Sequence, residues 1–463
     1  MTGLARVTIK APHRRVDVAL PDGVPVAEFL TEVLHHAGDG LADDGESHGG
    51  WLLRQADGTG LDPTSGLAAQ GVRDGAVLHL VPAATHWPEA EYDDIVEVIV
   101  EGTRRSGAAW TAATTRTAGR AVAGIAAGLG LVGIWLSGPD WRLPAAAAMG
   151  TALLLIIAGT AVSRAYGDAA AGAALASYAL PYAVLGGALM LAPGSALSET
   201  SGDERVSLFL VGSMALLVAS IVAGIGVGHR LRVFVCGTVT GLLGAVSALL
   251  AYLVTPAGAA AIVLTTIVTA AGAIPLLAIR LGRLPLPVTS LPSDLQDSGS
   301  GLDPQPDRAL VFAAVARTDE VLTGMLLAAG VAGTVAAGTV AWHGGVGGRI
   351  LVGLTSVALL LRARLFVTVH QRLPLLGAGV AGMATLAVAV MGGRADGGNL
   401  VVATLLALLS VIIAGAAMRY ATRAPSPYLG KAADVLEALC VVSAVPCACA
   451  VLGLYGLARG IVG

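Results

Sequence analysis

The chain has 463 residues, of which 55% are hydrophobic and only 13% are charged, and its mean hydropathy is +0.76. Soluble globular proteins are typically about one-quarter charged, so this composition excludes an ordinary soluble protein, a disordered chain and a nucleic-acid-binding protein. The net charge of −3 is the sum of two unlike parts: residues 1–100 hold 16 acidic and 6 basic residues (−10), and residues 101–463 hold 15 and 22 (+7). The sequence therefore predicts an acidic soluble head on a membrane-embedded body.

Residues 1–84 are predicted to form a cytosolic α+β domain. Alternating apolar residues predict four strands, and apolar residues at helical spacing from Val26 predict one helix between the second and third strands. The predicted strands are 5–10, 15–20, 51–54 and 76–81. This order is that of a ubiquitin-like β-grasp, and the segment from Leu67 to Leu80 resembles the end of that fold. Because Val81 continues into a linker and not into a free Gly-Gly tail, we predict a docking module, not a conjugated protein.

Residues 85–120 are predicted to be a cytosolic linker helix. Its acidic residues come first, between 89 and 101, and its basic residues follow at 104, 105, 116 and 120, which suits the helix dipole. Two interpretations stay open. The segment is either a solvated spacer with its basic end at the lipid headgroups, or a helix that binds a partner through the apolar run 95–100.

Eleven apolar stretches have the length of about 20 residues that a helix needs to cross a bilayer. They are 121–137, 143–163, 169–192, 206–228, 233–254, 257–279, 321–341, 344–361, 374–392, 399–417 and 433–457. Residues 121–279 thus form spans 1–6, and residues 321–463 contain spans 7–11. The fold class that follows is a ubiquitin-like domain attached to an all-α polytopic membrane bundle.

The arginines predict the orientation, because short loops rich in Lys and Arg stay in the cytoplasm. With the head inside, 17 basic residues of the body fall on the cytoplasmic side and 5 on the outer side, the latter being Arg142, Arg205, Arg349, Arg394 and Arg459. Residues 1–30 contain no signal-peptide core, so we expect the first span to direct insertion. The protein is predicted to be a multi-pass inner-membrane protein with a cytoplasmic N-terminus and a periplasmic C-terminus.

Residues 280–320 are predicted to be a long cytosolic loop between spans 6 and 7. Its centre, 284–306, is rich in Pro, Ser, Gly and Asp and is not expected to fold alone. A connection of this length is either an idle linker or a partner-docking arm, and we favour docking.

The spans contain almost no ionisable residues away from their ends. Arg349 lies near the outer end of the eighth span, and Asp434 and Glu437 lie near the inner end of the eleventh. Ion-coupled transporters and proton pumps keep such groups at membrane depth, so the pattern argues against both.

Prolines 181, 275 and 446 lie within spans, where they could break helices as in transporters. Without charged residues nearby, we interpret them as simple kinks.

Two segments match the dinucleotide-binding pattern G-x-G-x-x-G. They are Gly128, Gly130 and Gly133, and Gly377, Gly379 and Gly382. Both lie in apolar spans with no preceding strand, so the phosphate-binding interpretation fails its context. We expect close helix packing at these glycines, with Gly124 and Gly128 forming a GxxxG face.

The remaining candidate residues also do not indicate a catalytic or metal-binding site. Cys440, Cys447 and Cys449 have no histidine nearby to complete a metal site, and with Cys236 they lie in apolar segments that imply no disulfide framework. We interpret His35, His36 and His370 as surface histidines. Gly430-Lys431 lacks the rest of a phosphate-binding loop. The sequence predicts no catalytic, cofactor-binding or metal-ligating residue.

A ubiquitin-like head, an acidic-to-basic linker, eleven spans and a long loop after the sixth together resemble the EccD family of the actinobacterial type VII (ESX) secretion system. The resemblance implies a non-enzymatic inner-membrane core subunit that dimerises around a lipid-filled vestibule and assembles with EccB, the EccC ATPase and EccE. It also implies export of WXG100 and PE/PPE-type proteins.

Two other classes are weighed against this interpretation. One is a stand-alone permease or channel with a regulatory ubiquitin-like head. The other is a membrane enzyme acting on a lipid-linked substrate, which would need clustered acids or histidines at the membrane surface. The outer loops offer only scattered acids, at Asp140, Glu199, Asp203, Glu204 and Asp396.

Overall fold

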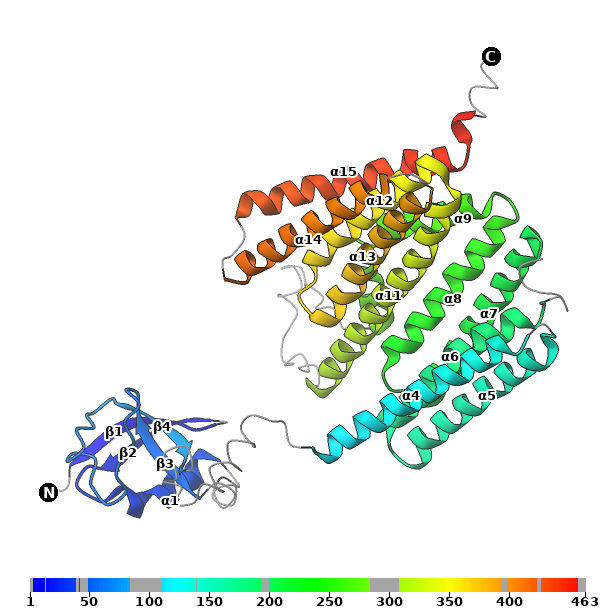
Figure 1. Ribbon diagram of the computed structural model, residues 1–463. Coiled ribbons are helices and arrows are strands. Elements are labelled where there is room, and N and C mark those ends of the chain that lie inside the picture. The colour runs from blue at the N-terminus through cyan, green and yellow to red at the C-terminus, as the bar shows by residue number, and fades with distance from the viewer. Residues whose placement is uncertain are drawn as a thin grey trace, which may run out of the picture. The chain divides into compact units, whose positions relative to one another are not determined.

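The computed structural model describes residues 3–12, 14–38, 41, 49–83, 110–138, 140–192, 200–283, 308–393, 398–422 and 426–456. The chain separates into two compact units, 1–111 and 112–463, each taken by itself below (Figure 1). The first unit is the α+β head, and the second is a bundle of long helices.

The head contains a four-stranded mixed sheet with strand order β2-β1-β4-β3. Its elements are β1 Leu4–Lys10, β2 Arg15–Pro21, α1 Val26–Ala37, β3 Trp51–Gln55 and β4 Val77–Pro82. The strand pairs β1–β2 and β3–β4 are antiparallel, and the central pair β1–β4 is parallel. The predicted β-grasp order is confirmed, and every predicted strand is found within a residue or two.

One face of the sheet is buried against α1, as the alternation of apolar residues requires. Ile9, Leu53 and Leu78 are fully buried, together with Leu67 from the connection before β4. All members of this hydrophobic cluster come from residues 5–80. Because the head buries a core made only of its own residues, we expect it to fold as an independent domain.

The first turn of α1 is completed by a distant loop. Pro25 precedes the helix and offers no side-chain cap, so the free N–H groups at the start of α1 need other acceptors. Val26 N–H donates to the carbonyl of Ser65 at 3.3 Å, and Ala27 N–H donates to that of Pro63 at 2.9 Å. Asp62 holds this loop, because its Oδ1 accepts from the backbone N–H and the hydroxyl of Thr64 at 2.9 and 2.7 Å.

Acid is expected to loosen this loop through Asp62. The hydrogen bonds from Thr64 lower the pKa of the Asp62 carboxyl below its ordinary value of 3.8. The ionised carboxylate therefore stabilises the folded head above that value, and the contribution is lost as the pH falls through the lowered pKa. As the pH falls from about 5 to about 2, we expect the unfolding temperature of the Asp62→Asn head to fall less than that of the wild-type head. Thermal unfolding of residues 1–84, followed by circular dichroism at each pH, measures this difference. An equal fall in unfolding temperature for the variant and the wild type would contradict the stabilising role of the Asp62 carboxylate.

The second unit consists of long, apolar helices joined by short connections. In chain order they are α4 Ala112–Leu136, α5 Arg142–Ala165, α6 Ala169–Leu189, α7 Gly202–Val227, α8 Leu231–Ala251, α9 Pro256–Ala270, α10 Ile274–Gly282, α11 Arg308–His343, α12 Gly345–Arg362, the 3₁₀ turn η5 Ala363–Leu365, α13 Val369–Gly392, α14 Gly398–Thr422 and α15 Pro427–Val451. Among the described residues, ten of these helices are long and apolar enough to cross a membrane, and α9 with α10 passes the same test only as a bent pair, which is an eleventh span if the two helices form one. Ten predicted spans correspond to one helix each, and the predicted span 257–279 corresponds to the α9–α10 pair.

Two helices begin earlier than the apolar stretches predict. α4 starts at Ala112, not near residue 121, and α11 starts at Arg308, not near residue 321. Helix formation continues beyond the apolar segment because it depends on backbone hydrogen bonds, not on hydropathy. The rest of the predicted linker (85–109) and of the predicted loop (284–307) lies outside the described residues, so their docking roles remain predictions.

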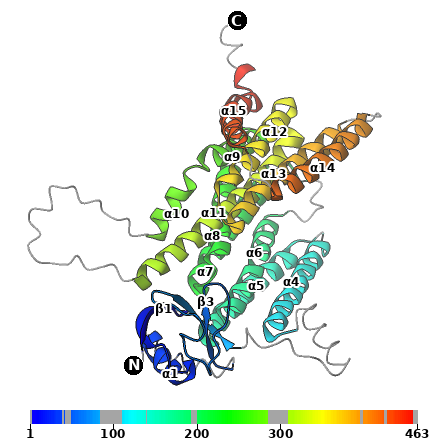
Figure 2. The same ribbon diagram turned by 90° about the vertical axis from the view of Figure 1, so that its left-hand side faces the viewer.

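Helices adjacent in sequence pack together from α5 to α8, and α11 then contacts α8, α9, α10, α12 and α13. α4 and α14 lie at the outside of the bundle (Figure 2), and neither has a buried residue among those described. Their apolar side chains are therefore left for lipid or for other membrane helices.

Candidate functional site

The sixth span is broken, not kinked, at Pro275. α9 ends at Ala270 and α10 begins at Ile274, with a bend of 74° between them. Pro275 stands in the first turn of α10, where its missing N–H costs nothing because that position has no intrahelical acceptor. The interpretation of Pro275 as a simple kink is wrong. Pro181 and Pro446, in contrast, lie inside the continuous helices α6 and α15.

A break inside a bundle leaves the last carbonyls of α9 without partners from their own helix. Arg362, the last residue of α12, fills this position: its Nη1 donates to the carbonyl oxygen of Val268 at 2.6 Å. A cation at a helix C-terminus also interacts favourably with the helix dipole. The guanidinium of Arg362 therefore caps the end of α9 from another helix.

Glu437 of α15 balances the charge of Arg362. The Nε of Arg362 lies 2.9 Å from Oε1 of Glu437, and Glu437 is only 8% exposed. Leu359, Ala363 and Cys440, which are close in sequence to the pair, belong to one hydrophobic cluster. The buried carboxylate is tolerated because it is paired with an opposite charge, although the Nε of Arg362 itself has no hydrogen-bond partner.

A second arginine extends the pair towards the surface. Arg364 is ion-paired with Asp434, its Nη2 lies 3.9 Å from Oε2 of Glu437, and its Nη1 donates to the carbonyl of Gly430 at 2.9 Å. Its own carbonyl accepts from Nη2 of Arg372 at 3.2 Å, and Arg372 also bonds the carbonyl of Phe366. These contacts tie the end of α12 to the starts of α13 and α15.

The same network continues to α11, about three turns from the start of that helix. Nε2 of Gln371 donates to Oδ1 of Asp319 at 2.7 Å. The neighbouring residue, Glu320, accepts from the backbone N–H of Arg232 at 3.0 Å. Since Arg230 gives α8 no side-chain cap, Glu320 caps α8 from another helix. Acidic groups from α11 and α15 thus contact the ends of three other helices, α8, α12 and α13.

Sequence reasoning placed Asp434 and Glu437 near a span end and found almost no ionisable residues away from the span ends. α15 begins at Pro427, so Glu437 lies about three turns inside it and is buried. The available signal was the spacing of Asp434 and Glu437, which puts both on one helix face, matched by Arg362 and Arg364 near the end of the eighth span. In chemical terms the cluster is a set of mutually neutralised ions that fixes helix ends. Among the described residues, no three His, Cys, Asp or Glu side chains gather as a metal site would need.

The glycines of the two G-x-G-x-x-G segments divide into packed and open positions. A Cβ at Gly130 would meet the Tyr182 hydroxyl at 2.4 Å, and one at Gly379 would meet Leu360 Cγ at 2.5 Å. Gly382 and Gly124 are also closely packed, whereas Gly128, Gly133 and Gly377 have no neighbour within 4 Å. Helix packing is confirmed for the first group. Of the predicted GxxxG face, Gly124 packs against Tyr178 of α6, whereas a Cβ at Gly128 would have no neighbour within 4 Å, and a role of this face in self-association stays a prediction.

The other candidate residues lie apart from one another. Cys440 packs in the cluster around the broken span, whereas Cys447 packs against a different one. His35, His36 and His370 are exposed, and so is Lys431. The structure brings none of them to the arginine–carboxylate cluster.

Comparison with known proteins finds a protein family that matches each of the two units. Residues 115–461 match the family model of the EccD-like transmembrane domain, and residues 4–80 match that of YukD, a protein of the WXG100 protein secretion system. The chain is 30% identical over 485 residues to the ESX-4 secretion system protein eccD4 of Mycobacterium tuberculosis, in strains CDC 1551 and H37Rv alike. That match covers 99% of this chain and 97% of the relative.

Two solved structures share the fold. Protomer 1 of the ESX-3 core complex aligns with a TM-score of 0.59 at 21% identity, covering 98% of this chain and all of that one. A chain of the MycP5-free ESX-5 inner membrane complex, State II, aligns with a TM-score of 0.56 at 21% identity, covering 91% of this chain. With the family model over most of the chain and a 30% identical relative over its whole length, this protein belongs to the EccD family of multi-pass membrane components of type VII secretion systems.

Proposed function

We propose that this chain is the non-enzymatic core scaffold of a type VII export complex in the inner membrane. The observation that carries the proposal is the end-to-end match with an ESX-4 eccD4 protein, because it spans the head, the linker and the bundle together. The proposed roles of the segments follow the predicted domains: a cytosolic head (1–84), a linker (85–120), spans 1–6 (121–279), a cytosolic loop (280–320) and spans 7–11 (321–463).

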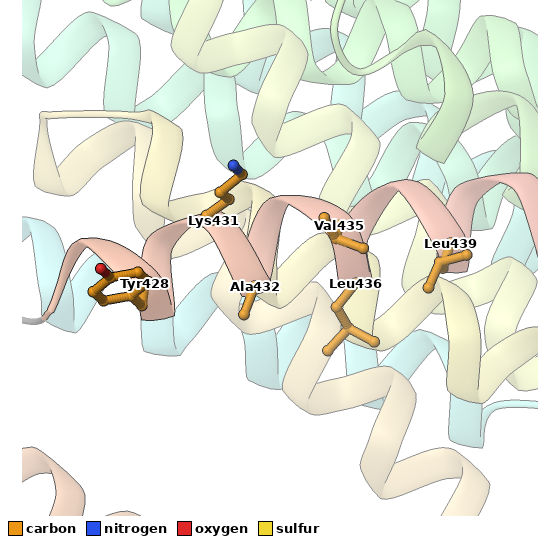
Figure 3. A pocket seen from close by; sticks show the side chains of 6 residues that line it. All are labelled: Tyr428, Lys431, Ala432, Val435, Leu436 and Leu439. Carbon is orange, nitrogen blue, oxygen red and sulfur yellow. The ribbon is translucent and has the colours of Figure 1, made fainter.

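Exposed apolar surface supports a scaffold that works in an assembly. α4 and α14 bury none of their described side chains, and a shallow apolar groove runs along the N-terminal part of α15 (Figure 3). It is lined by Tyr428, Lys431, Ala432, Val435, Leu436 and Leu439. We assign these surfaces to self-association as a dimer, to membrane lipids and to the spans of EccB, EccC and EccE.

The cluster at the broken span supports a structural role, not a catalytic one. Its arginines and carboxylates are engaged with one another and with backbone carbonyls, and none is left as a proton carrier or nucleophile. The energy for export would come from the EccC ATPase, and the cargo would be proteins of the WXG100 and PE/PPE type. The head would lie in the cytoplasm and the C-terminus in the periplasm.

Co-purification tests this proposal. A tag on this chain in its native host, with gentle detergent extraction, is expected to recover a large complex that contains an ATPase. Deletion of residues 1–82 is expected to leave the bundle inserted but to reduce export of the cargo to background, because the head docks partners. A stable, lone monomer would overturn the proposal in favour of a stand-alone permease, and unchanged export in the deletion variant would overturn the docking role.

A further inference from the structure

The outward face of the head's sheet carries basic side chains in one line. The face that packs on α1 takes Ile9, Leu53 and Leu78, so the residues next to them in each strand point the other way. The pairing register then places four of these outward residues side by side. Arg15 of β2 pairs with Lys10 of β1, Lys10 with His79 of β4, and His79 with Arg54 of β3. We call Arg15, Lys10, His79 and Arg54 the basic row; it takes one residue from each of the four strands.

Neighbouring strands lie about 4.8 Å apart, so the basic row concentrates its charge over roughly 15 Å. Like charges directly opposite each other on a sheet are destabilising. In the part of the chain that the structure describes, none of the four side chains is in an ion pair, and the Nε of Arg54 is buried without a hydrogen-bond partner. The nearest acid on this face, Asp17, accepts the Thr8 hydroxyl at 2.5 Å. The head thus holds an uncompensated basic row at a cost to its own stability.

The row also stands out against the charge of the segment that contains it. Residues 1–100 carry 16 acidic and only 6 basic residues, and three of those six, with His79, are in the row. Apart from Asp17, acidic residues such as Glu28 and Glu32 lie elsewhere, on α1. On the same face, Val77, Thr8 and Asp17 flank the row on one side, and the apolar Leu52 and Val81 flank it on the other.

We propose that the basic row is a binding site for an acidic peptide segment of a partner protein. Three permanent cations and a histidine in a line, bordered on one side by the apolar Leu52 and Val81, complement an extended peptide with alternating carboxylates. A bilayer of anionic lipid is disfavoured, because the head as a whole is strongly negative and a broad anionic surface would face its acidic parts as well. The assignment rests on the proposed function, since a subunit that docks the cytosolic parts of other chains needs such a surface.

The test uses the full chain in detergent and a fluorescent probe peptide of six glutamates separated by valines. The variant Lys10→Gln with Arg15→Gln removes two charges from the basic row. The matched control, Arg14→Gln with Arg73→Gln, removes two exposed charges of the head outside it. We expect the row variant to weaken peptide binding at least tenfold and the control by less than threefold, with wild-type binding falling as salt is raised.

A second readout separates a binding role from a structural one. Because the row variant relieves repulsion between neighbouring strands, its head is expected to unfold at the same or a higher temperature than the wild type while losing the peptide. Equal binding by wild type and row variant, or an equal loss in the control, would overturn the assignment. Displacement of the peptide by phosphatidylglycerol vesicles, dependent on Lys10 and Arg15, would assign the row to the membrane and overturn it as well.

Co-purification of the row variant distinguishes the two proposals. If the full complex is recovered although the variant and the wild type bind the probe equally, the proposed function stands and the acidic-peptide site fails. If the wild-type chain binds the probe through the basic row but co-purification of the wild-type chain recovers no complex, the acidic-peptide site stands and the proposed function fails.

Discussion

Glu437→Gln is expected to destabilise the membrane unit by about 3–5 kcal/mol, the usual effect of removing one partner of a buried ion pair. The variant keeps the shape of the side chain but leaves the Arg362 guanidinium as an uncompensated charge among apolar residues. The same guanidinium caps α9 through the carbonyl of Val268, so the end of the broken span is expected to loosen with it. Thermal unfolding in detergent, followed by circular dichroism, measures the effect.

The neighbouring carboxylate provides a matched control. Asp434 pairs with Arg364, but its side chain is 65% exposed, whereas that of Glu437 is 10% exposed. Exposed ion pairs contribute only about 0–1 kcal/mol, so Asp434→Asn should have a small effect. The double variant Arg362→Met with Glu437→Leu should recover part of the loss, because neither charge then remains buried. Equal unfolding temperatures for Glu437→Gln and Asp434→Asn would contradict the assigned role.

Gly172→Ala is expected to destabilise the packing of α5 against α6 by about 1–3 kcal/mol, as overpacked interiors are. A Cβ at Gly172 would lie 2.5 Å from the carbonyl oxygen of Gly159 and 2.8 Å from the backbone nitrogen of Ser163. A Cβ at Gly159 would in turn lie 2.7 Å from the carbonyl oxygen of Gly172. These atoms belong to the backbone and cannot rotate away, so the two helices would have to separate.

Gly150→Ala is the control, because Gly150 lies in α5, the helix against which Gly172 packs, and a Cβ there would have no neighbour within 4 Å. Glycine inside a helix costs about 0.5–1 kcal/mol relative to alanine, so this variant should be neutral or slightly stabilising. Unfolding temperatures of the two variants in detergent measure the difference. If Gly172→Ala were as stable as Gly150→Ala, the close approach of α5 and α6 would not determine their packing.

Both predictions concern how a bundle of mostly neutral, small residues acquires defined helix positions. Apolar side chains alone give little preference between neighbours in lipid, because lipid tails are as apolar as leucine. Close glycine contacts set the α5–α6 pair, and the arginine–carboxylate cluster sets the ends of α9, α12, α13 and α15. A scaffold that must hold several partners needs such fixed positions.

Much of the fold was predictable because it depends on local patterns. The alternation in 5–10 and 15–20 fixes strand faces, and the length of each apolar stretch fixes a span. The boundaries at Ala112 and Arg308 were not predictable from hydropathy, since polar residues extend those helices beyond the apolar stretches. The sequence also did not predict that the helix breaks next to Pro275 but continues through the two other span prolines. The effect of a proline depends on which groups replace the hydrogen bonds that it removes.

The sequence by itself determined the class of the molecule, an acidic β-grasp head followed by eleven predicted spans. Acidic residues are concentrated in the head, and basic residues outnumber acidic ones in the rest of the chain. Only the tertiary structure decided which charges meet. Arg362 and Glu437 come from separate helices, and the basic row takes one residue from each of four strands. The spacing of Asp434 and Glu437 is a partial signal in the sequence, but nothing there assigns either grouping its partners, since each depends on helix packing or strand register that brings distant residues within contact distance.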